Sequence, residues 1–161
     1  NKALILAVDP GKSGALAFLD YKSGALVEVC DMPTTAGTKG SNKKELNLYL
    51  LAEIIDRHAQ NIRYAVIEDV HSMPHDGVVS AFSFGKTHGV VIGVIASYMI
   101  PMYFISPSVW KKSMGLGYEK DKSRELASKL YEASAHLFLK KRDDGRAEAC
   151  LLANFGRRFW L

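Results

Sequence analysis

The stretch Leu4-Ile5-Leu6-Ala7-Val8-Asp9-Pro10-Gly11 runs through five apolar residues and then reaches an acid, a proline and a glycine. A short, continuous apolar run is typical of a strand that is buried on both faces of a sheet. Proline and glycine are turn-forming residues, so the strand ends there. We therefore predict a central strand over residues 4–8, with Asp9 held at its end.

The residues that follow predict an antiparallel hairpin and then alternating helices and strands. Two strand-like runs, 14–20 and 25–31, are separated by a short polar link, Tyr21-Lys22-Ser23-Gly24, which suits a hairpin. The segment 34–44 lacks apolar periodicity and is expected to be a loop. The remaining expected elements are a helix over about 44–60, a strand at 64–67, a long apolar helix at 79–99, a strand at 102–105, a short helix from Pro107, and helices at 122–131 and 142–155. This order predicts an α/β fold with a five-stranded mixed sheet flanked by helices, in a single domain over 1–161.

Composition and charge fit a globular protein with a polyanionic partner. The chain has 161 residues and a formal net charge of +4, with a pI near 9.0, which is compatible with binding to nucleic acid. Its two cysteines, Cys30 and Cys150, have neither metal-ligand spacing nor the density of a disulfide scaffold. No secretory signal precedes the first expected strand, so we expect an intracellular, cytoplasmic protein.

Residues 89–110 carry no charged side chain, which is also a property of membrane-spanning segments. Pro101 and Pro107 interrupt this run, and the apolar part before them is short for a span. We therefore expect a buried helix followed by a buried strand, and no membrane partner.

Acidic residues stand at the ends of two expected strands and near the start of the last helix. Asp9 and Glu68 each follow an apolar strand, and Asp144 and Glu148 lie four residues apart on one helix face. Acids held at the rim of a rigid sheet repel one another unless a cation compensates their charge. The pattern predicts a site for Mg²⁺, with Mn²⁺ able to substitute, and two such ions would support phosphodiester cleavage.

Asp143 is an alternative to Asp144 as the third acid. Asp143 projects to the side of Glu148, so we prefer Asp144. Acids at a helix start can also serve only to cap the helix and to complement its dipole, a role that accounts well for Asp143.

Several short motifs occur in one order along the chain. They are Asp9-Pro-Gly, Val66-Ile-Glu68, Phe84-Gly-Lys-Thr-His-Gly89, Pro107-Ser-Val-Trp-Lys-Lys112 and Asp144-Gly-Arg-Ala-Glu148-Ala. Together they resemble the RuvC-type crossover-junction endonucleases, particularly the forms found in phages. The resemblance implies an RNase H-like fold, a homodimer, dependence on magnesium or manganese, and paired nicks in branched DNA during recombination and repair. Carried over by position, it implies Asp9, Glu68, Asp144 and Glu148 as the catalytic metal ligands.

The chain departs from the cellular members of this family at two places. Those enzymes usually space the last two acids by three residues and use two Asp, whereas here the spacing is four and the second acid is Glu148. They also often carry an aromatic residue a few positions after the glutamate, near the junction centre, and here that position is His71.

Basic residues are expected to contact the DNA backbone. The resemblance implies this role for lysines between the Pro107 helix and the next one, namely Lys111, Lys112, Lys120 and Lys122. Lysine neutralises phosphate charge, and we expect Lys122 to lie nearest the scissile phosphate. A solvated lysine-rich loop is the alternative, and it is the favoured interpretation for Lys39, Lys43 and Lys44.

Four other functions have to be weighed against a junction endonuclease. A P-loop is excluded, because Leu6 stands where the loop before Gly11-Lys-Ser needs a glycine. A kinase or actin-like ATPase shares the fold topology but needs two lobes around its nucleotide. A nuclease acting on RNA–DNA hybrids and a non-catalytic protein that binds branched DNA both remain open.

The long apolar helix carries Gly85, Gly89 and Gly93 at intervals of four residues, on one face. Its other apolar residues spread around most of its circumference, so one face can cover the sheet while another needs a partner. We predict a two-fold homodimer through this helix. Cover by the C-terminal helix of the same chain is the alternative.

Overall fold

The computed structural model describes residues 2–36 and 43–159. The predicted loop over 34–44 is therefore described only at its two ends, and Lys39 lies outside the described residues. At those ends the chain forms two short antiparallel strands, β4 (Thr34–Thr35) and β5 (Glu45–Leu46). Strands of two residues are too short to give an alternating sequence pattern, so the sequence did not predict them.

A five-stranded mixed sheet forms the centre of the molecule, as predicted. The strands are β1 (Leu4–Asp9), β2 (Ala15–Asp20), β3 (Leu26–Asp31), β6 (Ile62–Glu68) and β7 (Met102–Ile105). They lie in the order β3-β2-β1-β6-β7. The central strand β1 pairs antiparallel with β2 and parallel with β6, and β6 pairs parallel with β7.

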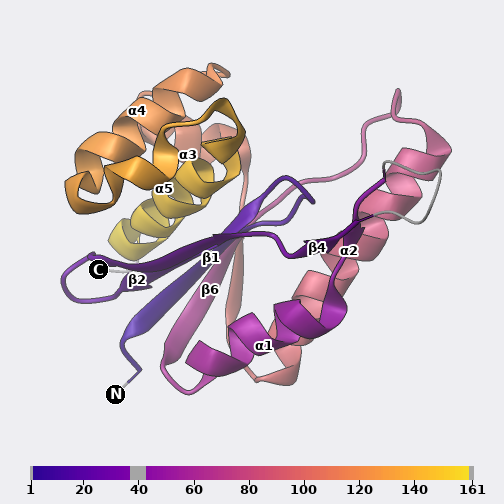
Figure 1. Ribbon diagram of the computed structural model, residues 1–161, viewed down its shortest axis with the longest axis horizontal. Helices are drawn as coiled ribbons and strands as arrows, with labels where there is room; N and C mark the ends of the chain where they lie inside the picture. The colour runs from indigo at the N-terminus through magenta and orange to yellow at the C-terminus, as the bar shows by residue number, and fades with distance from the viewer. Residues whose placement is uncertain (1, 37–42, 160–161) are drawn as a thin grey trace.

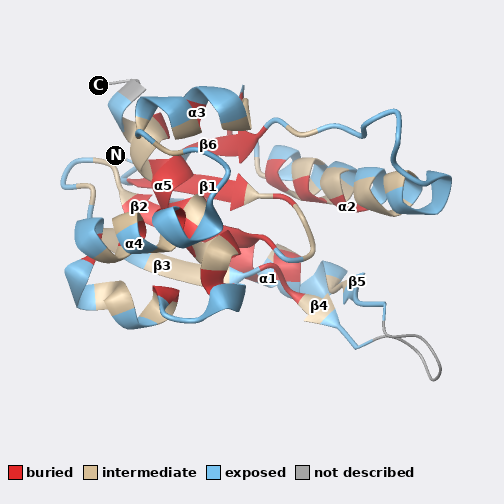
Figure 2. Ribbon diagram, turned by 90° about the horizontal axis from the view of Figure 1, so that it is seen from above, coloured by how far each residue is buried: buried red, intermediate tan, exposed pale blue. Residues whose placement is uncertain are grey.

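Helices cover both faces of the sheet (Figure 1). One face is covered by α1 (Leu48–Ala59) and α2 (Val78–Ser97), and the other by α3 (Pro107–Ser113), α4 (Lys120–Leu130) and α5 (Asp144–Phe159). Successive side chains of a strand point to opposite faces. Leu6 and Val8 of β1 therefore pack in the core beneath α1 and α2, while Ile5 and Ala7 pack in the core beneath α5. The buried strands lie between these layers (Figure 2).

Some element boundaries differ from the predicted ones for local reasons. The helix expected from about residue 44 begins at Leu48, because the side chain of Asn47 caps it by accepting a hydrogen bond from the Leu50 N–H at 3.1 Å. Two 3₁₀ helices, η1 (Glu132–Phe138) and η2 (Lys141–Asp143), connect α4 to α5. Neither was predicted, since such short turns carry little sequence signal.

The expectation that residues 89–110 form a buried helix and a buried strand is only partly correct. The described side chains of α2 that are buried are Thr87, Val91 and Ile95, and the first turns of the helix extend past the sheet (Figures 1 and 2). Length and composition alone would allow α2 to cross a membrane. At the sheet edge, β7 exposes Tyr103 and Phe104 in part.

Glycines shape the contact between α5 and the turn between β1 and β2. A Cβ at Gly145 would lie 2.4 Å from the carbonyl oxygen of Ser13, so the first turn of α5 can approach this turn only without that atom. Within the turn itself, a Cβ at Gly14 would lie 2.0 Å from the carbonyl oxygen of Asp9, so the tight turn also requires glycine there. Asp144 and Glu148 thereby come to lie near Asp9.

Substitution Gly145→Ala should therefore destabilise the protein. The added methyl group meets backbone that cannot move independently, which should lower the free energy of unfolding by about 2 kcal/mol. Gly117→Ala is the matched control, because a Cβ there meets nothing within 4 Å. Urea denaturation would measure both variants. Equal stability of Gly145→Ala and the unsubstituted protein would contradict the close approach.

Candidate active site

Two of the predicted acids emerge side by side from the sheet. Asp9 ends β1 and Glu68 ends β6, and these strands are parallel neighbours in which Val8 is paired with Ile67. The carboxyl ends of parallel strands lie at the same edge of a sheet, so the two carboxylates face the same region.

The start of α5 brings two further acids to this edge. Asp144 is the first residue of α5 and Glu148 follows one turn later. Both line a cleft of about 370 Å³ together with Asp9. The remaining lining residues are Gly11, Ser13, Gly14, Lys120, Arg142 and Gly145. We call this the carboxylate cleft.

Asp143 has a different environment from Asp144. Its side chain is 4% exposed and accepts a hydrogen bond from the backbone N–H of Lys140 at 2.8 Å. Arg146 lies 3.9 Å from its other oxygen. Asp143 thus caps η2 and does not line the carboxylate cleft, whereas Asp144 does.

Glu68 is held by a buried hydrogen bond. The indole N–H of Trp110, on α3, donates to a carboxylate oxygen of Glu68 at 2.9 Å. Trp110 is fully buried and Glu68 is 7% exposed, so the indole fixes the direction of that carboxylate. Sequence reasoning included Trp110 in a motif but assigned it no role.

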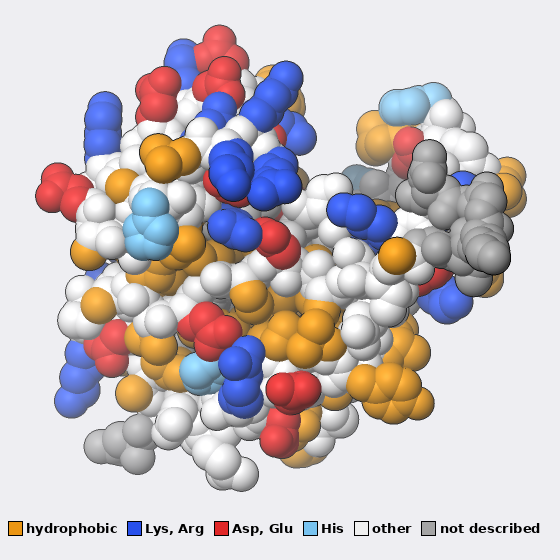
Figure 3. Space-filling view, viewed as in Figure 1, with side chains coloured by type: hydrophobic (Ala, Val, Ile, Leu, Met, Phe, Trp, Pro, Cys, Tyr) orange, Lys and Arg blue, Asp and Glu red, His pale blue; other side chains and the backbone are white. Residues whose placement is uncertain are grey.

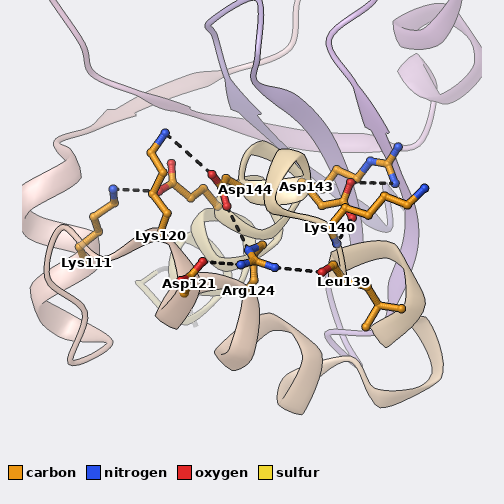
Figure 4. A network of polar contacts seen from close by, with 10 residues as sticks. Lys111, Lys120, Asp121, Arg124, Leu139, Lys140, Asp143 and Asp144 are labelled. Atoms are coloured by element: carbon orange, nitrogen blue, oxygen red, sulfur yellow. Dashed lines mark hydrogen bonds and ion pairs between the residues drawn. The ribbon is translucent and has the colours of Figure 1, made fainter.

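Basic side chains contact the acids of the cleft (Figure 4). The Lys111 ammonium donates to Glu148 at 3.0 Å, and the Lys120 ammonium lies 3.9 Å from Asp144. Nε of Arg124, on α4, lies 3.2 Å from the other oxygen of Asp144. Lysine and arginine side chains gather around acidic ones on this face of the molecule (Figure 3).

Sequence reasoning did not single out Arg124. The guanidinium also donates to the Leu139 carbonyl at 3.0 Å and pairs with Asp121. It therefore ties α4 to η1 and to the first residue of α5. The contacts of Arg124 join separate parts of the chain that only packing brings together, so no spacing in the sequence predicts them.

Three other predicted DNA contacts lie outside the carboxylate cleft. Lys122 is exposed on the first turn of α4, with its ammonium 2.7 Å from Glu119. Lys112 and His71 line a neighbouring cleft of about 440 Å³, which Lys111 also lines.

The pKa values of Asp9 and Glu68 are both raised at this site. Burial raises the pKa of Asp9 to about 7, and the carboxylates of Glu68 and Glu148 add to this rise, against opposing effects of the Gly11 N–H and Lys111. Burial also raises the pKa of Glu68, while the hydrogen bond from Trp110 lowers it. Within the described residues, no three His, Cys, Asp or Glu side chains are gathered closely enough to form a ready-made metal site.

The raised pKa of Asp9 predicts how stability depends on pH in the absence of divalent metal. The folded state binds the Asp9 proton more tightly than the unfolded chain does, so stability falls as pH rises from about 4 to above 7. Asp9→Asn removes this cost. In EDTA at pH 8 the variant should be more stable than the unsubstituted protein by about 4 kcal/mol, or roughly 12 °C in Tm, and the difference should nearly vanish at pH 4. If the stability advantage of Asp9→Asn over the unsubstituted protein were smaller at pH 8 than at pH 4, the raised pKa of Asp9 would be contradicted.

Comparison with known proteins identifies the fold. No protein-family model and no curated protein match the chain. A T. thermophilus RuvC structure in complex with Holliday junction substrate is similar with a TM-score of 0.65 and 16% sequence identity, over 97% of this chain and 96% of that chain. A second Thermus thermophilus RuvC structure gives a TM-score of 0.57 and 15% identity, over 98% of this chain and 96% of the other. The sheet order and flanking helices agree with this likeness, and the chain has the RNase H-like fold of these RuvC structures.

Proposed function

We propose that this protein is a structure-selective, metal-dependent DNA endonuclease. Its main substrate would be the four-way (Holliday) junction, cut by paired nicks, and other branched DNA would be cut as well. The observation that carries the proposal is the meeting of Asp9, Asp144 and Glu148 at one cleft, with Glu68 on the adjoining strand end. One of the RuvC structures of similar fold is bound to Holliday junction substrate, which supports branched DNA as the partner.

The carboxylate cleft carries the right type of ligand for divalent cations, but its carboxylates would have to draw closer together around an ion. Carboxylate oxygens are the ligands that Mg²⁺ and Mn²⁺ prefer. Burial is the largest cause of the raised pKa of Asp9, and a cation would offset the additional effect of the Glu68 and Glu148 carboxylates. Asp9, Glu68, Asp144 and Glu148 would hold two such ions, which would supply an activated water and a counter-charge for the leaving oxygen. Lys111 and Arg124 pair with Glu148 and Asp144, so they would hold these carboxylates in place.

Basic residues around the cleft suit the DNA backbone. Lys111 and Lys120 are close enough to the acids to contact a phosphate bound there. Lys122 remains our candidate for the scissile phosphate, and reaching it requires exchange of its ion pair with Glu119. Lys112 and His71 would contact the strand beside the cleft.

A homodimer through α2 would provide the second active site that paired nicks require. Gly85, Gly89 and Gly93 are exposed, and a Cβ on any of them meets nothing within 4 Å. α5 packs on the opposite face of the sheet (Figure 1), so it does not cover them. A two-fold axis beside this face would direct two equivalent sites toward one symmetric junction.

A substrate panel tests the proposal. Labelled four-way, three-way, flap and linear DNA, together with an RNA–DNA hybrid, would be incubated with the protein in Mg²⁺ and in EDTA. We expect symmetric nicks in the four-way junction and none in EDTA. Preferential cutting of the RNA strand would favour a hybrid nuclease, and binding without cutting would favour a non-catalytic branched-DNA-binding protein.

Asp9→Asn should abolish cleavage and leave junction binding intact or tighter. The amide removes a metal ligand and also removes repulsion toward phosphate. Asp20→Asn is a matched control. Asp20 also ends a strand, but it pairs with Leu4, the first residue of β1, and so lies at the end of the strands opposite Asp9. Single-turnover cleavage and gel-shift binding would measure both variants. Cutting by Asp9→Asn at the normal rate would refute the assignment of the metal site.

Gly89→Leu should separate the dimer while the monomer stays folded. The monomer has room for the side chain, but a partner helix packed on the glycine face does not. Lys129→Leu adds the same leucine to an exposed position of α4 and should leave the dimer unchanged. Light scattering at micromolar concentration, with and without junction DNA, would measure the mass. An unsubstituted protein that is monomeric in both conditions would rule out the dimer.

A further inference from the structure

A second cleft opens beside the carboxylate cleft. It measures about 440 Å³ and is lined by three segments: the loop after β6, α3 with the residue before it, and the loop between α3 and α4. Its lining residues include Asp69, Ser106, Ser108, Lys112, Leu116 and Tyr118. We call it the side cleft.

The side cleft adjoins the proposed active site through shared and adjacent residues. Lys111 lines the side cleft and donates to Glu148 of the carboxylate cleft at 3.0 Å. Asp69 lines the side cleft and directly follows Glu68 in the chain. A DNA strand with a phosphate at the carboxylate cleft therefore has a neighbouring nucleotide within reach of the side cleft.

Tyr118 is the most distinctive residue of the side cleft. It is 97% exposed in the loop between α3 and α4, so its ring contributes almost no packing to the fold. Lys112 supplies positive charge at the same cleft, and Leu116 supplies apolar surface. An accessible aromatic ring beside basic residues is the combination that binds unpaired nucleotides, because bases stack on the ring while phosphates contact the cations.

The polar lining favours a base over a second phosphate. The Asp69 carboxylate would repel a phosphate, whereas it can accept a hydrogen bond from the amino group of a base. The hydroxyls of Ser106 and Ser108 lie 2.8 Å apart and add groups that can both donate and accept hydrogen bonds.

We propose that the side cleft binds one unpaired nucleobase next to the scissile phosphate, with Tyr118 stacked on it. This inference rests on the proposed function and extends it. Branch points offer unpaired or easily unstacked bases, whereas linear duplex does not. Occupation of the side cleft would thus contribute to the preference for branched DNA.

The test compares Tyr118 variants on intact and abasic junctions. Tyr118→Ala should bind and cut an intact four-way junction roughly tenfold less well, since one base stacked on an aromatic ring contributes about that factor. Tyr118→Phe keeps the ring and should behave like the unsubstituted protein. Tyr49→Ala, at an 89% exposed tyrosine on α1, should have no effect.

Abasic substitution identifies the base concerned. An abasic nucleotide would be placed in turn at each position flanking the mapped cut. At one position the abasic nucleotide should reduce binding and cleavage by the unsubstituted protein by the same factor. On that abasic junction, Tyr118→Ala should cause no further loss of binding or cleavage. Undiminished activity of Tyr118→Ala on the intact junction, or an equal loss at every abasic position, would overturn the inference while leaving the endonuclease proposal standing. Failure of the unsubstituted protein to bind or cut any branched DNA would overturn both.

Discussion

The first turn of α5 can lie against the β1–β2 turn only because Gly145 carries no side chain. A Cβ on Gly145 would lie 2.4 Å from the carbonyl oxygen of Ser13, and close backbone approach of this kind is available to glycine alone. The contact has a chemical consequence, because α5 carries Asp144 and Glu148 while β1 carries Asp9. Strand pairing of β1 with β6 adds Glu68. A local steric constraint therefore determines which carboxylates meet, and the proposed chemistry depends on that meeting.

Gathering these acids has an electrostatic cost that neighbouring residues reduce. The indole of Trp110 hydrogen-bonds Glu68, Lys111 pairs with Glu148, and Arg124 pairs with Asp144. These contacts hold the carboxylates in defined positions, yet the pKa of Asp9 is still raised to about 7. Burial is the largest cause of this rise, and the carboxylates of Glu68 and Glu148 add to it. A perturbed carboxyl group of this kind is typical of functional sites. A divalent cation would relieve the part that comes from the neighbouring carboxylates.

Much of the fold could be predicted from the sequence, because its strongest signals are local. The apolar run ending at Asp9 indicated the central strand, and helical periodicity indicated the helices. The four acids could be proposed from their positions after strands and on one helix face. The ion pairs of Arg124 and the indole bond to Glu68 could not, since they join residues brought together only by packing. Tyr118 likewise carried no pattern of its own, and its cleft exists only once α3, α4 and the loop after β6 are in place.

The proposed chemistry requires Asp9, Glu68, Asp144 and Glu148 to bind divalent metal together. Anomalous diffraction from crystals soaked in millimolar Mn²⁺ would show whether they do. We expect one or two anomalous peaks at coordinating distance from Asp9 and from the acids of α5, lost in Asp9→Asn crystals. Crystals with Mn²⁺ bound elsewhere, and no anomalous density among these four carboxylates, would contradict the proposed chemistry.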